Sequence, residues 1–345
     1  MSVLKDKFGR KLKDLRISVT DRCNFRCSFC MPVKSEKWSG GVYNFLPKSE
    51  LLTFEEIIRF TKILVKLGIE KVRITGGEPL VKENIEGLIS KLSKIKGIKD
   101  LALTTNGFNL TDYASELKKA GLNRITVSLN SLNNEVFKKV NNCECNVENI
   151  LDGIKTAENA GFVSIKINTV IQRGVNDKDI LDIAEYFKGT SHIPRFIEYM
   201  DVGNLNDWDP EDVVPGADII KTINKRYPLE PVLSSNNGEV AKKFRYTDGS
   251  GEIGIITSIS QPFCSDCTRL RLSTDGKLYT CLFSSDHIDL KKEIRGGVSD
   301  KKINDILQSL WFNRDDRYSE LRNTHLRNEN PTQKNKKVEM HRIGG

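Results

Sequence analysis

A unit that repeats between about residue 50 and residue 200 constrains the fold of this chain most strongly. Each copy reads as a helix, a glycine that ends it, and a short strand rich in β-branched residues. A glycine directly after a helix readily adopts the left-handed conformation that ends it. Apolar strands rich in Ile and Val are typical of a buried parallel sheet. From helix end to strand, the copies cover Lys66–Thr75, Ile95–Thr105, Lys119–Leu129 and Asn159–Val170.

Alternating helices and strands predict an α/β fold with right-handed crossovers. Thr53 and Glu56 predict a capping box for the first helix, and Thr111 is the predicted cap of the helix that ends at Gly121. The pattern does not separate an open sheet from a barrel, although a full eight-unit barrel typically needs about 250 residues. The six predicted strands are Leu15–Val19, Lys71–Thr75, Leu101–Thr105, Arg124–Leu129, Val163–Val170 and Arg195–Tyr199.

Polar and glycine-rich segments lie at the carboxyl ends of these strands, where functional groups gather in such folds. Gly76–Pro79 follows the second strand and Thr104–Gly107 the third. Ser128–Asn130 ends the fourth strand, and Met200–Asp201 ends the sixth. We therefore expect the active site at this edge of the sheet.

Three cysteines, Cys23, Cys27 and Cys30, follow the first strand with the spacing C-x3-C-x2-C. A four-iron cluster normally takes four cysteines, so three would leave one iron without a protein ligand. An open metal position is typical of a site that performs chemistry. A structural zinc site is the alternative, but no histidine in the first hundred residues could complete it.

A second triplet, Cys264, Cys267 and Cys281, has the spacing C-x2-C-x13-C. His287 lies six residues further on, so a Cys3His zinc site competes with a second iron–sulfur cluster. Taken alone, this triplet leaves both interpretations open. A second open iron facing the barrel could bind a substrate heteroatom, which a closed zinc site could not. The remaining pair, Cys143 and Cys145, suits no cluster spacing and is interpreted as incidental thiols.

Composition excludes several classes of protein. The 345 residues are 38% hydrophobic and 29% charged, an ordinary globular balance. No signal segment or membrane-length apolar run is visible, so a cytoplasmic location without membrane association is expected. The formal charge of +8 indicates an anionic partner or simply a solvated surface. No RNA-recognition signature, Walker A motif or G-x-G-x-x-G occurs, which predicts no nucleic-acid partner and no P-loop.

The strand–helix pattern weakens after residue 205, and we place a domain boundary near residue 232. The first domain is then 1–232, and the second, 233–345, carries the second triplet. Within the second domain, the pattern predicts short strands and a helix around Lys302–Phe312. The polar, basic end from Asn328 onward is predicted to be mobile.

The first triplet resembles the signature of radical S-adenosylmethionine (SAM) enzymes, in which SAM chelates the fourth iron. Both triplets together resemble the GTP 3′,8-cyclase family, which opens molybdenum cofactor biosynthesis. The resemblance implies a partial, six-unit β/α barrel with a smaller C-terminal α+β domain that covers the barrel opening. It is carried by Leu15–Cys23, Val72–Leu80, Leu103–Gly107, Arg195–Met200, Phe263–Arg271 and the final Gly344–Gly345.

The resemblance also assigns roles to residues. Cys23, Cys27 and Cys30 would hold the SAM-cleaving 4Fe–4S cluster, and Cys264, Cys267 and Cys281 a second 4Fe–4S cluster. The implied SAM contacts are Phe29, Gly77, Ser128 and Met200. The implied GTP contacts are Arg16, Arg73, Thr104, Lys166, Arg269, Leu270 and Arg271. Of these, the implied catalytic residues are Arg16, Arg73, Arg269 and Arg271, because permanently charged, forked side chains suit a triphosphate.

The implied reaction splits SAM into methionine and a 5′-deoxyadenosyl radical. That radical removes the C3′ hydrogen of GTP, C3′ then bonds to guanine C8, and a further electron and proton complete the product. The product is (8S)-3′,8-cyclo-7,8-dihydroguanosine 5′-triphosphate. Implied partners are a flavodoxin- or ferredoxin-like electron donor and the downstream cyclic pyranopterin monophosphate synthase, and a homodimer is left open.

Two positions depart from the family pattern. Position 29 is Phe where Tyr is common, and Asn130 stands where the family usually has Asp. Two alternatives remain open at this stage. One is another radical SAM enzyme that acts on a peptide or RNA, and the other is a zinc protein without catalytic activity.

Overall fold

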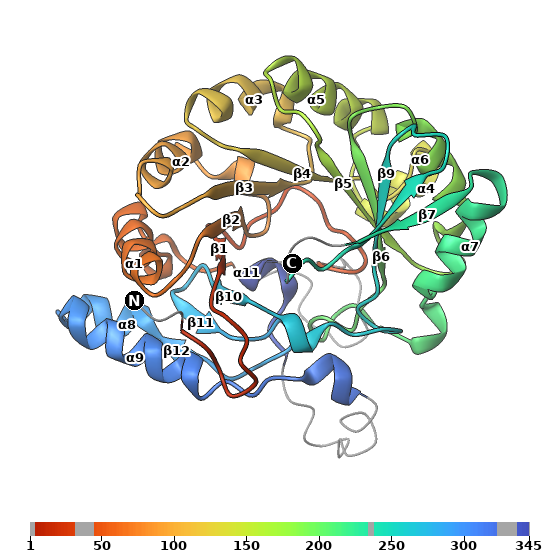
Figure 1. Ribbon diagram of the computed structural model, residues 1–345. Coiled ribbons are helices and arrows are strands. Elements are labelled where there is room, and N and C mark those ends of the chain that lie inside the picture. Colours follow the sequence, from red (N-terminus) through yellow and green to blue (C-terminus); the bar gives the residue numbers. More distant parts are fainter. Residues whose placement is uncertain (1–3, 32–44, 234–237, 323–336, 345) are drawn as a thin grey trace.

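A computed structural model describes residues 4–31, 45–233, 238–322 and 337–344 of the chain. In this part of the chain the strands form one curved, twelve-stranded sheet with helices on its outer face (Figure 1). Its strand order is β12-β11-β10-β1-β2-β3-β4-β5-β6-β9-β8-β7. The described strands are β1 (Asp14–Ser18), β2 (Lys71–Thr75), β3 (Asp100–Thr105), β4 (Arg124–Ser128), β5 (Lys166–Ile171), β6 (Ile193–Glu198), β7 (Leu229–Val232), β8 (Lys242–Tyr246), β9 (Glu252–Ile256), β10 (Arg269–Leu272), β11 (Lys277–Tyr279) and β12 (Ile288–Asp289).

The helices alternate with the strands as the sequence predicted. The described helices are α1 (Phe54–Lys66), α2 (Ile85–Ser93), α3 (Leu110–Lys119), α4 (Asn134–Asn141), α5 (Val147–Asn159), α6 (Ile180–Phe187), α7 (Gly216–Arg226), α8 (Leu290–Arg295), α9 (Asp300–Phe312) and α11 (Met340–Ile343). Strands β1 to β6 are parallel neighbours, each paired with the next. The predicted α/β fold with a partial barrel is confirmed.

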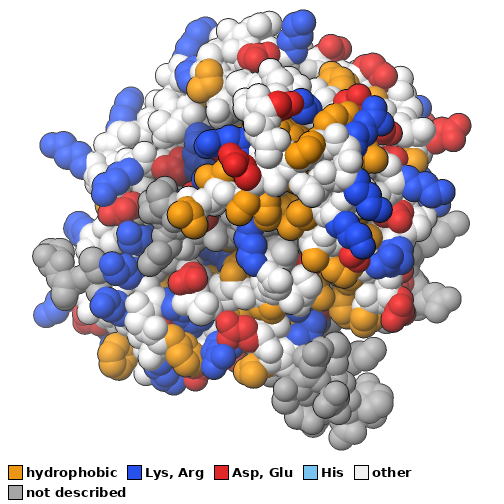
Figure 2. Space-filling view, turned by 45° about the vertical axis from the view of Figure 1, so that its right-hand side comes forward, with side chains coloured by type: hydrophobic (Ala, Val, Ile, Leu, Met, Phe, Trp, Pro, Cys, Tyr) orange, Lys and Arg blue, Asp and Glu red, His pale blue; other side chains and the backbone are white. Residues whose placement is uncertain are grey.

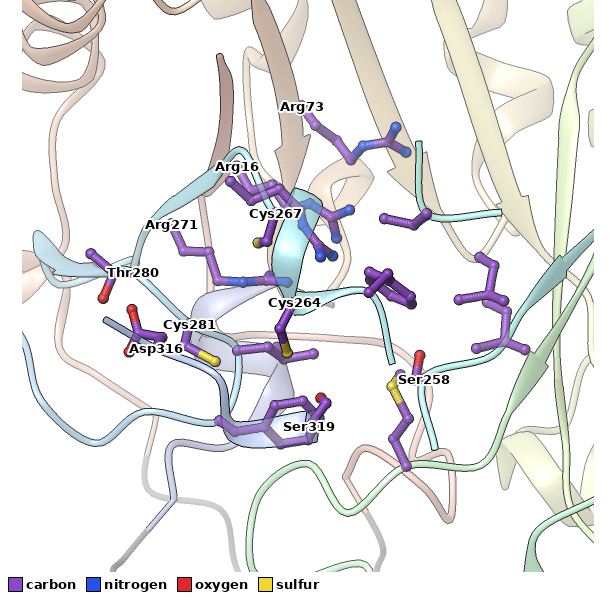
Figure 3. Close-up of a pocket in the computed structure, with 18 of the residues that line it drawn as sticks. Arg16, Arg73, Ser258, Cys264, Cys267, Arg271, Thr280, Cys281, Asp316 and Ser319 are labelled. Atoms are coloured by element: carbon purple, nitrogen blue, oxygen red, sulfur yellow. The ribbon is translucent and has the colours of Figure 1, made fainter. Parts of the chain in front are cut away.

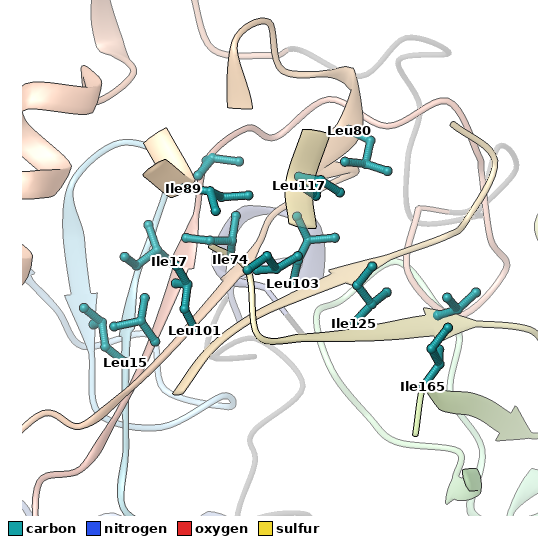
Figure 4. Packing of buried hydrophobic residues seen from close by; sticks show 14 of the residues in the cluster. Leu15, Ile17, Ile74, Leu80, Ile89, Leu101, Leu103, Leu117, Ile125 and Ile165 are labelled. Carbon is teal, nitrogen blue, oxygen red and sulfur yellow. The ribbon is translucent and has the colours of Figure 1, made fainter. Parts of the chain in front are cut away.

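The hydrophobic core lies between the sheet and the surrounding helices (Figure 4). Leu15 and Ile17 of β1 and Ile74 of β2 are fully buried, as are Ile89 of α2 and Leu117 of α3. Residues of one strand that face this layer alternate with residues that face the barrel interior, since side chains in a strand point to opposite faces in turn. The apolar layer therefore fixes which polar side chains face inward.

Two C-terminal strands extend the parallel barrel at both edges. β10 pairs in parallel with β1, and β9 pairs in parallel with β6. The parallel part of the sheet thus has β10 and β9 at its two ends, contributed by residues beyond the predicted boundary near residue 232. That boundary coincides with the end of β7 and remains a prediction.

Local signals had mixed outcomes. The capping box of Thr53 and Glu56 is present, and Gly121 has a positive φ of 94° at the end of α3, as predicted. The role given to Thr111 is wrong, because α3 begins at Leu110 and Thr111 lies inside its first turn. The fifth strand begins at Lys166 and not at Val163, because Ser164 has a φ of 54° that breaks the extended backbone.

The C-terminal segment returns into the barrel. Helix α11 lies at its centre, beside β1 (Figure 1), and Ile343 is fully buried. The prediction of a mobile end is therefore wrong for residues 337–344, and residues 328–336 lie outside the described residues. No described helix is long and apolar enough to span a membrane. On the face in Figure 2, Lys and Arg side chains are interspersed with Asp and Glu.

Candidate active site

Three arginines stand side by side in the barrel interior. Arg16 of β1 is in register with Arg73 of β2 on one side and with Arg271 of β10 on the other. All three line one pocket, and their side chains point into it (Figure 3). Burial and the neighbouring Arg269 together lower the pKa of Arg271 to about 10. A row of like charges in an enclosed space is costly without an anion, so the row predicts an anionic ligand.

Partners of the row are sparse among the described residues. Arg73 donates from Nη1 to the hydroxyls of Thr104 (3.3 Å) and Thr126 (3.2 Å). The Nε atoms of Arg16 and Arg73 are buried and have no hydrogen-bond partner in the described part of the chain. Buried donors without partners are costly, and a bound acceptor would satisfy them.

The second cysteine triplet lies in the same pocket as the arginine row. Cys264, Cys267 and Cys281 line it close to Arg16 and Arg271 (Figure 3). Met200 and Thr104 also line this pocket. The fold thus brings Arg16 and Arg73 close to three thiols that lie about 190 to 270 positions further along the chain.

Cations surround one thiol of this triplet. Burial raises the pKa of Cys267, but Arg269 and Arg314 outweigh burial and bring that pKa to about 6. Burial and, to a smaller extent, Asp316 raise the pKa of Cys281 to about 12. A thiol that ionises readily is a good metal ligand, since the thiolate is the ligating form.

The first cysteine triplet lies in a different environment, at the carboxyl end of β1. Burial and the neighbouring Glu78 together raise the pKa of Cys23 to about 11. Burial also raises the pKa values of Cys27 and Cys30. These thiols become thiolates only if a cationic group compensates the burial, and the irons of a cluster would do so.

The segment Gly76–Pro79 packs directly against the first cysteine loop. A Cβ at Gly76 would lie 2.5 Å from Thr20 O, and one at Gly77 would lie 2.2 Å from Arg22 O. Only glycine permits this approach. Gly77 N donates to Thr20 O (2.7 Å), and the buried Glu78 carboxylate accepts from Asn106 N (2.7 Å). The two glycines therefore hold the end of β2 beside the cysteine loop.

Asn130, a departure from the family pattern, supports the same loop. Its Nδ2 donates to Asn141 Oδ1 (3.0 Å), and the Cys27 thiol donates to that same oxygen at 3.4 Å. Arg26 N donates to Asn141 O (2.9 Å). The amide of Asn130 thus has a donor role that an ionised aspartate could not fill.

The C-terminal segment connects the two cysteine sites. The carbonyl oxygen of Gly344 accepts a hydrogen bond from Arg271 Nη1, and the backbone of His341 hydrogen-bonds the Cys30 thiol. Gly344 has a φ of 69°, and a Cβ there would lie 2.1 Å from Thr75 Cγ2. The predicted approach of this tail to the site is therefore seen for Gly344, while Gly345 lies outside the described residues.

The other predicted site residues are more scattered. Phe29, Gly77 and Ser128 lie outside the pocket with the arginine row, on the loop and strand ends near the first triplet. Lys166 lies beside the pocket, where burial, Arg195 and Arg124 lower its pKa to about 7. The Leu270 side chain points away from the pocket into the hydrophobic core, so only its backbone could contact a ligand.

Several lining residues were missed by the sequence analysis. Arg195 and Asn168 line the pocket, and Arg195 donates to Asn168 Oδ1 from Nε (2.9 Å) and Nη2 (2.6 Å). An arginine in an apolar strand was a usable signal for Arg195, as it was for Arg16. Arg10 and Arg314 also line the pocket, and no local pattern marked either of them.

His287, the candidate fourth ligand of a zinc site, does not line the pocket with the three thiols. It lines a neighbouring surface hollow with Asp286 and Lys302. Among residues 4–31, 45–233, 238–322 and 337–344, no group of three His, Cys, Asp or Glu side chains is arranged to hold a single metal ion.

Comparison with known proteins agrees with this geometry. The family profile "Radical SAM superfamily" matches residues 17–187, and "Molybdenum Cofactor Synthesis C" matches residues 193–320. The GTP 3′,8-cyclase of Acidothermus cellulolyticus is 49% identical over 323 residues, which cover 92% of this chain and 88% of that protein. The GTP 3′,8-cyclase of Staphylococcus haemolyticus is 48% identical over 346 residues, 99% of both chains.

This chain belongs to the GTP 3′,8-cyclase family. As a radical SAM enzyme of that family, it uses SAM and a 4Fe–4S cluster. Among solved structures, Streptococcus suis SuiB bound to its precursor peptide SuiA is similar in fold, with a TM-score of 0.60 at 15% identity. That match covers 91% of this chain and 67% of SuiB. The two thiol triplets of this family member are therefore set in a known radical SAM architecture.

Proposed function

We propose that this protein converts GTP to (8S)-3′,8-cyclo-7,8-dihydroguanosine 5′-triphosphate, the first step of molybdenum cofactor biosynthesis. The observation that carries this proposal is the arginine row that lines one pocket together with the second thiol triplet. A nucleoside triphosphate has a polyanionic end and a base with nitrogen and oxygen atoms. The arginine row suits the polyanionic triphosphate, and an open iron at the second triplet suits the base.

The triphosphate end of GTP lies against Arg16, Arg73 and Arg271 in this proposal, with Arg269 beside the second triplet. Thr104 and Lys166 lie at the same end of the barrel, where Arg73 donates to Thr104 and faces Lys166. Arg195, which the sequence analysis missed, adds a further cation to this wall. Leu270 takes part through its backbone only, because its side chain is buried in the core.

Cys23, Cys27 and Cys30 hold the first 4Fe–4S cluster, and Cys264, Cys267 and Cys281 hold a second. Both thiol sets suit such a group, because the free thiols of each triplet are near enough to affect one another's pKa, and the raised pKa values at the first call for compensating positive charge. When bound, the first cluster supplies the electron that cleaves SAM.

SAM lies between the first triplet and the arginine pocket in this proposal. Phe29 and Gly77 contact it from the cysteine loop and the end of β2, and Ser128 contacts it from the end of β4. Met200 lines the arginine pocket and lies at the border between the two sites. The C-terminal segment, which joins Cys30 to Arg271 through His341 and Gly344, closes the space between them and excludes water from reactive intermediates.

The proposal extends to partners and location. A low-potential flavodoxin- or ferredoxin-like protein delivers electrons, and a cyclic pyranopterin monophosphate synthase consumes the product. A cytoplasmic location suits a chain whose eight cysteines are all free.

The test is anaerobic turnover after reconstitution with iron and sulfide. Protein, SAM and dithionite are mixed with GTP, ATP or no nucleotide, and 5′-deoxyadenosine and nucleotide products are quantified by mass spectrometry. The proposal predicts 5′-deoxyadenosine and an isomer of GTP that has the mass of GTP and is separated from it by chromatography, both only with GTP. Equal SAM cleavage under all three conditions would remove GTP as the substrate and leave the radical SAM assignment in place.

A further inference from the structure

Two buried arginines donate hydrogen bonds to the backbone of the turn that carries Cys264 and Cys267. Arg10 Nη1 donates to Cys264 O (2.9 Å) and to Asp316 O (2.7 Å), and Arg314 Nη1 donates to Cys267 O (2.7 Å). Cys264 and Cys267 lie at the two ends of one short turn, in which Cys267 N donates to Cys264 O (3.2 Å). Each end of that turn is thus fixed by its own guanidinium.

A single buried carboxylate orients both arginines. Asp6 Oδ2 accepts from Arg10 Nε (2.5 Å) and from Arg314 Nη1 (3.4 Å), and its side chain is 0% exposed. Asp6 Oδ1 accepts from the backbone nitrogens of Phe8 (3.0 Å) and Arg10 (2.9 Å), which shapes the turn that carries Arg10. The side chains of Arg10 and Arg314 are each 1% exposed. Groups buried to this degree keep one geometry only if their hydrogen bonds are satisfied.

One nitrogen of these two arginines has no hydrogen-bond acceptor among the described residues. Arg10 Nη2 is buried without a hydrogen-bond partner in the described part of the chain, and Arg10 lines the pocket with Cys264 and Cys267. A buried guanidinium nitrogen without an acceptor is costly. An acceptor held by the second triplet, such as a cluster sulfide or an atom of the bound base, would satisfy it.

We propose that Asp6, Arg10 and Arg314 form a positioning network for the second triplet, and that Arg10 Nη2 donates to the group bound there and raises its reduction potential. This inference rests on the proposed second cluster. Hydrogen bonds to cluster sulfurs and nearby charges set cluster potentials. Within the network, Asp6 and Asp316 balance Arg10 and Arg314 in formal charge. Neutralising Arg10 or Arg314 therefore makes the net charge beside the triplet more negative, and neutralising Asp6 makes it more positive.

The experiment is an anaerobic redox titration of the reconstituted full-length protein, followed by electron paramagnetic resonance. A Cys27→Ala variant, which leaves the second triplet intact, identifies the signal of the second cluster. We expect Arg10→Gln to shift its midpoint to a more negative potential and Asp6→Asn to shift it to a more positive one. Arg10→Lys keeps the positive charge but loses the several donor nitrogens of the guanidinium. Its midpoint potential should lie between those of the wild type and Arg10→Gln.

The matched control is Arg317→Gln. Arg317 stacks on the same Phe8 ring as Arg10, at 5.4 Å against 5.1 Å, but it is 44% exposed and pairs with Glu320. This variant should keep the wild-type midpoint and iron content. If Arg10→Gln loses the second cluster while Arg317→Gln keeps it, the result supports the positioning role, and Asp6→Asn and Arg10→Lys then test the potential.

Unchanged midpoints in all network variants, or shifts of one sign in Arg10→Gln and Asp6→Asn, would overturn the inference. A wild-type chain that binds about four irons in place of about eight gives a different result. It would overturn the proposed second cluster itself, and the inference with it. Iron analysis of the wild type therefore separates the two failures.

Discussion

The two cysteine triplets have the same number of thiols but different electrostatic surroundings. At the first, burial raises the pKa values of all three thiols, with a further contribution from Glu78 at Cys23 and from Cys23 and Glu339 at Cys30. At the second, Arg269 and Arg314 bring the pKa of Cys267 to about 6, whereas burial and Asp316 raise the pKa of Cys281. The difference follows from position, since the first triplet lies on a loop after β1, whereas the second lies beside the arginine row.

This contrast indicates that the two sites have different roles. Carboxylates and low polarity beside a cluster disfavour the added negative charge of the reduced state, which makes that state a stronger reductant. Cleavage of SAM requires such a reductant. Cations beside the second triplet favour an anionic substrate and a less reducing cluster. The first site is thus suited to electron delivery and the second to substrate binding.

Removal of one thiol from each triplet should have the largest effect and should separate the two roles. Cys27→Ala should abolish 5′-deoxyadenosine formation, because the first cluster is lost. Cys267→Ala should abolish the cyclised product and retain some SAM cleavage that no longer depends on GTP. Both products are measured by mass spectrometry after anaerobic turnover. Loss of SAM cleavage in Cys267→Ala, with the first cluster fully assembled, would contradict the separation of roles.

Replacement of one arginine of the row should weaken GTP binding and stabilise the protein in the absence of GTP. Arg16→Met removes repulsion with Arg73 and Arg271, so the free energy of unfolding without GTP should rise by about 1 kcal/mol and the Tm by about 1–2 °C. GTP affinity should fall about 10- to 100-fold, since a hydrogen bond to a charged group contributes about 1.5–3 kcal/mol. Calorimetry and equilibrium dialysis measure the two effects. The control is Arg59→Gln, because Arg59 pairs with Asp300 and does not line the pocket. If Arg16→Met lowered both the Tm and the GTP affinity, Arg16 would have a structural role.

The tail makes a smaller, geometric contribution. Gly344→Ala brings a Cβ to 2.1 Å from Thr75 Cγ2 at a φ of 69°, so the tail must shift away from Arg271. We expect turnover to fall roughly tenfold, in line with about 1–2 kcal/mol for a non-glycine residue in this conformation. Gly174→Ala is the matched control, because Gly174 has a φ of 71° and no atom near its Cβ position. Equal losses in both variants would show that general backbone strain is responsible.

The weakest expected effect is a pH dependence through Lys166. Its pKa is about 7 because of burial and the facing Arg195, Arg124, Arg73 and Lys243. A triphosphate would favour the charged form and raise this pKa, so binding takes up a proton and GTP affinity falls as pH rises above 7. The slope should be at most about tenfold per pH unit. Lys166→Arg, which stays charged, should flatten the profile measured by equilibrium dialysis between pH 6.5 and 8.5, and an unchanged slope would contradict the role.

Local sequence signals predicted much of this architecture. The glycine stops and β-branched strands were sufficient for β1 to β6, and the two triplets marked both sites because their spacing is local. The extension of the sheet by β9 and β10 was not predictable in this way, since pairing between β10 and β1 joins segments about 250 residues apart. Arg10 and Arg314 were missed for the same reason, because only the folded chain brings them to Cys264 and Cys267.

GTP binding to the two cysteine variants tests the central claim most directly. Equilibrium dialysis of GTP is performed anaerobically with reconstituted Cys27→Ala and Cys267→Ala, each checked for about four irons per chain. The account predicts that Cys27→Ala binds GTP as the wild type does, and that Cys267→Ala binds it at least about tenfold more weakly, a difference of about 1.4 kcal/mol. Wild-type affinity in Cys267→Ala together with weak binding in Cys27→Ala would place the substrate at the first triplet and contradict the account.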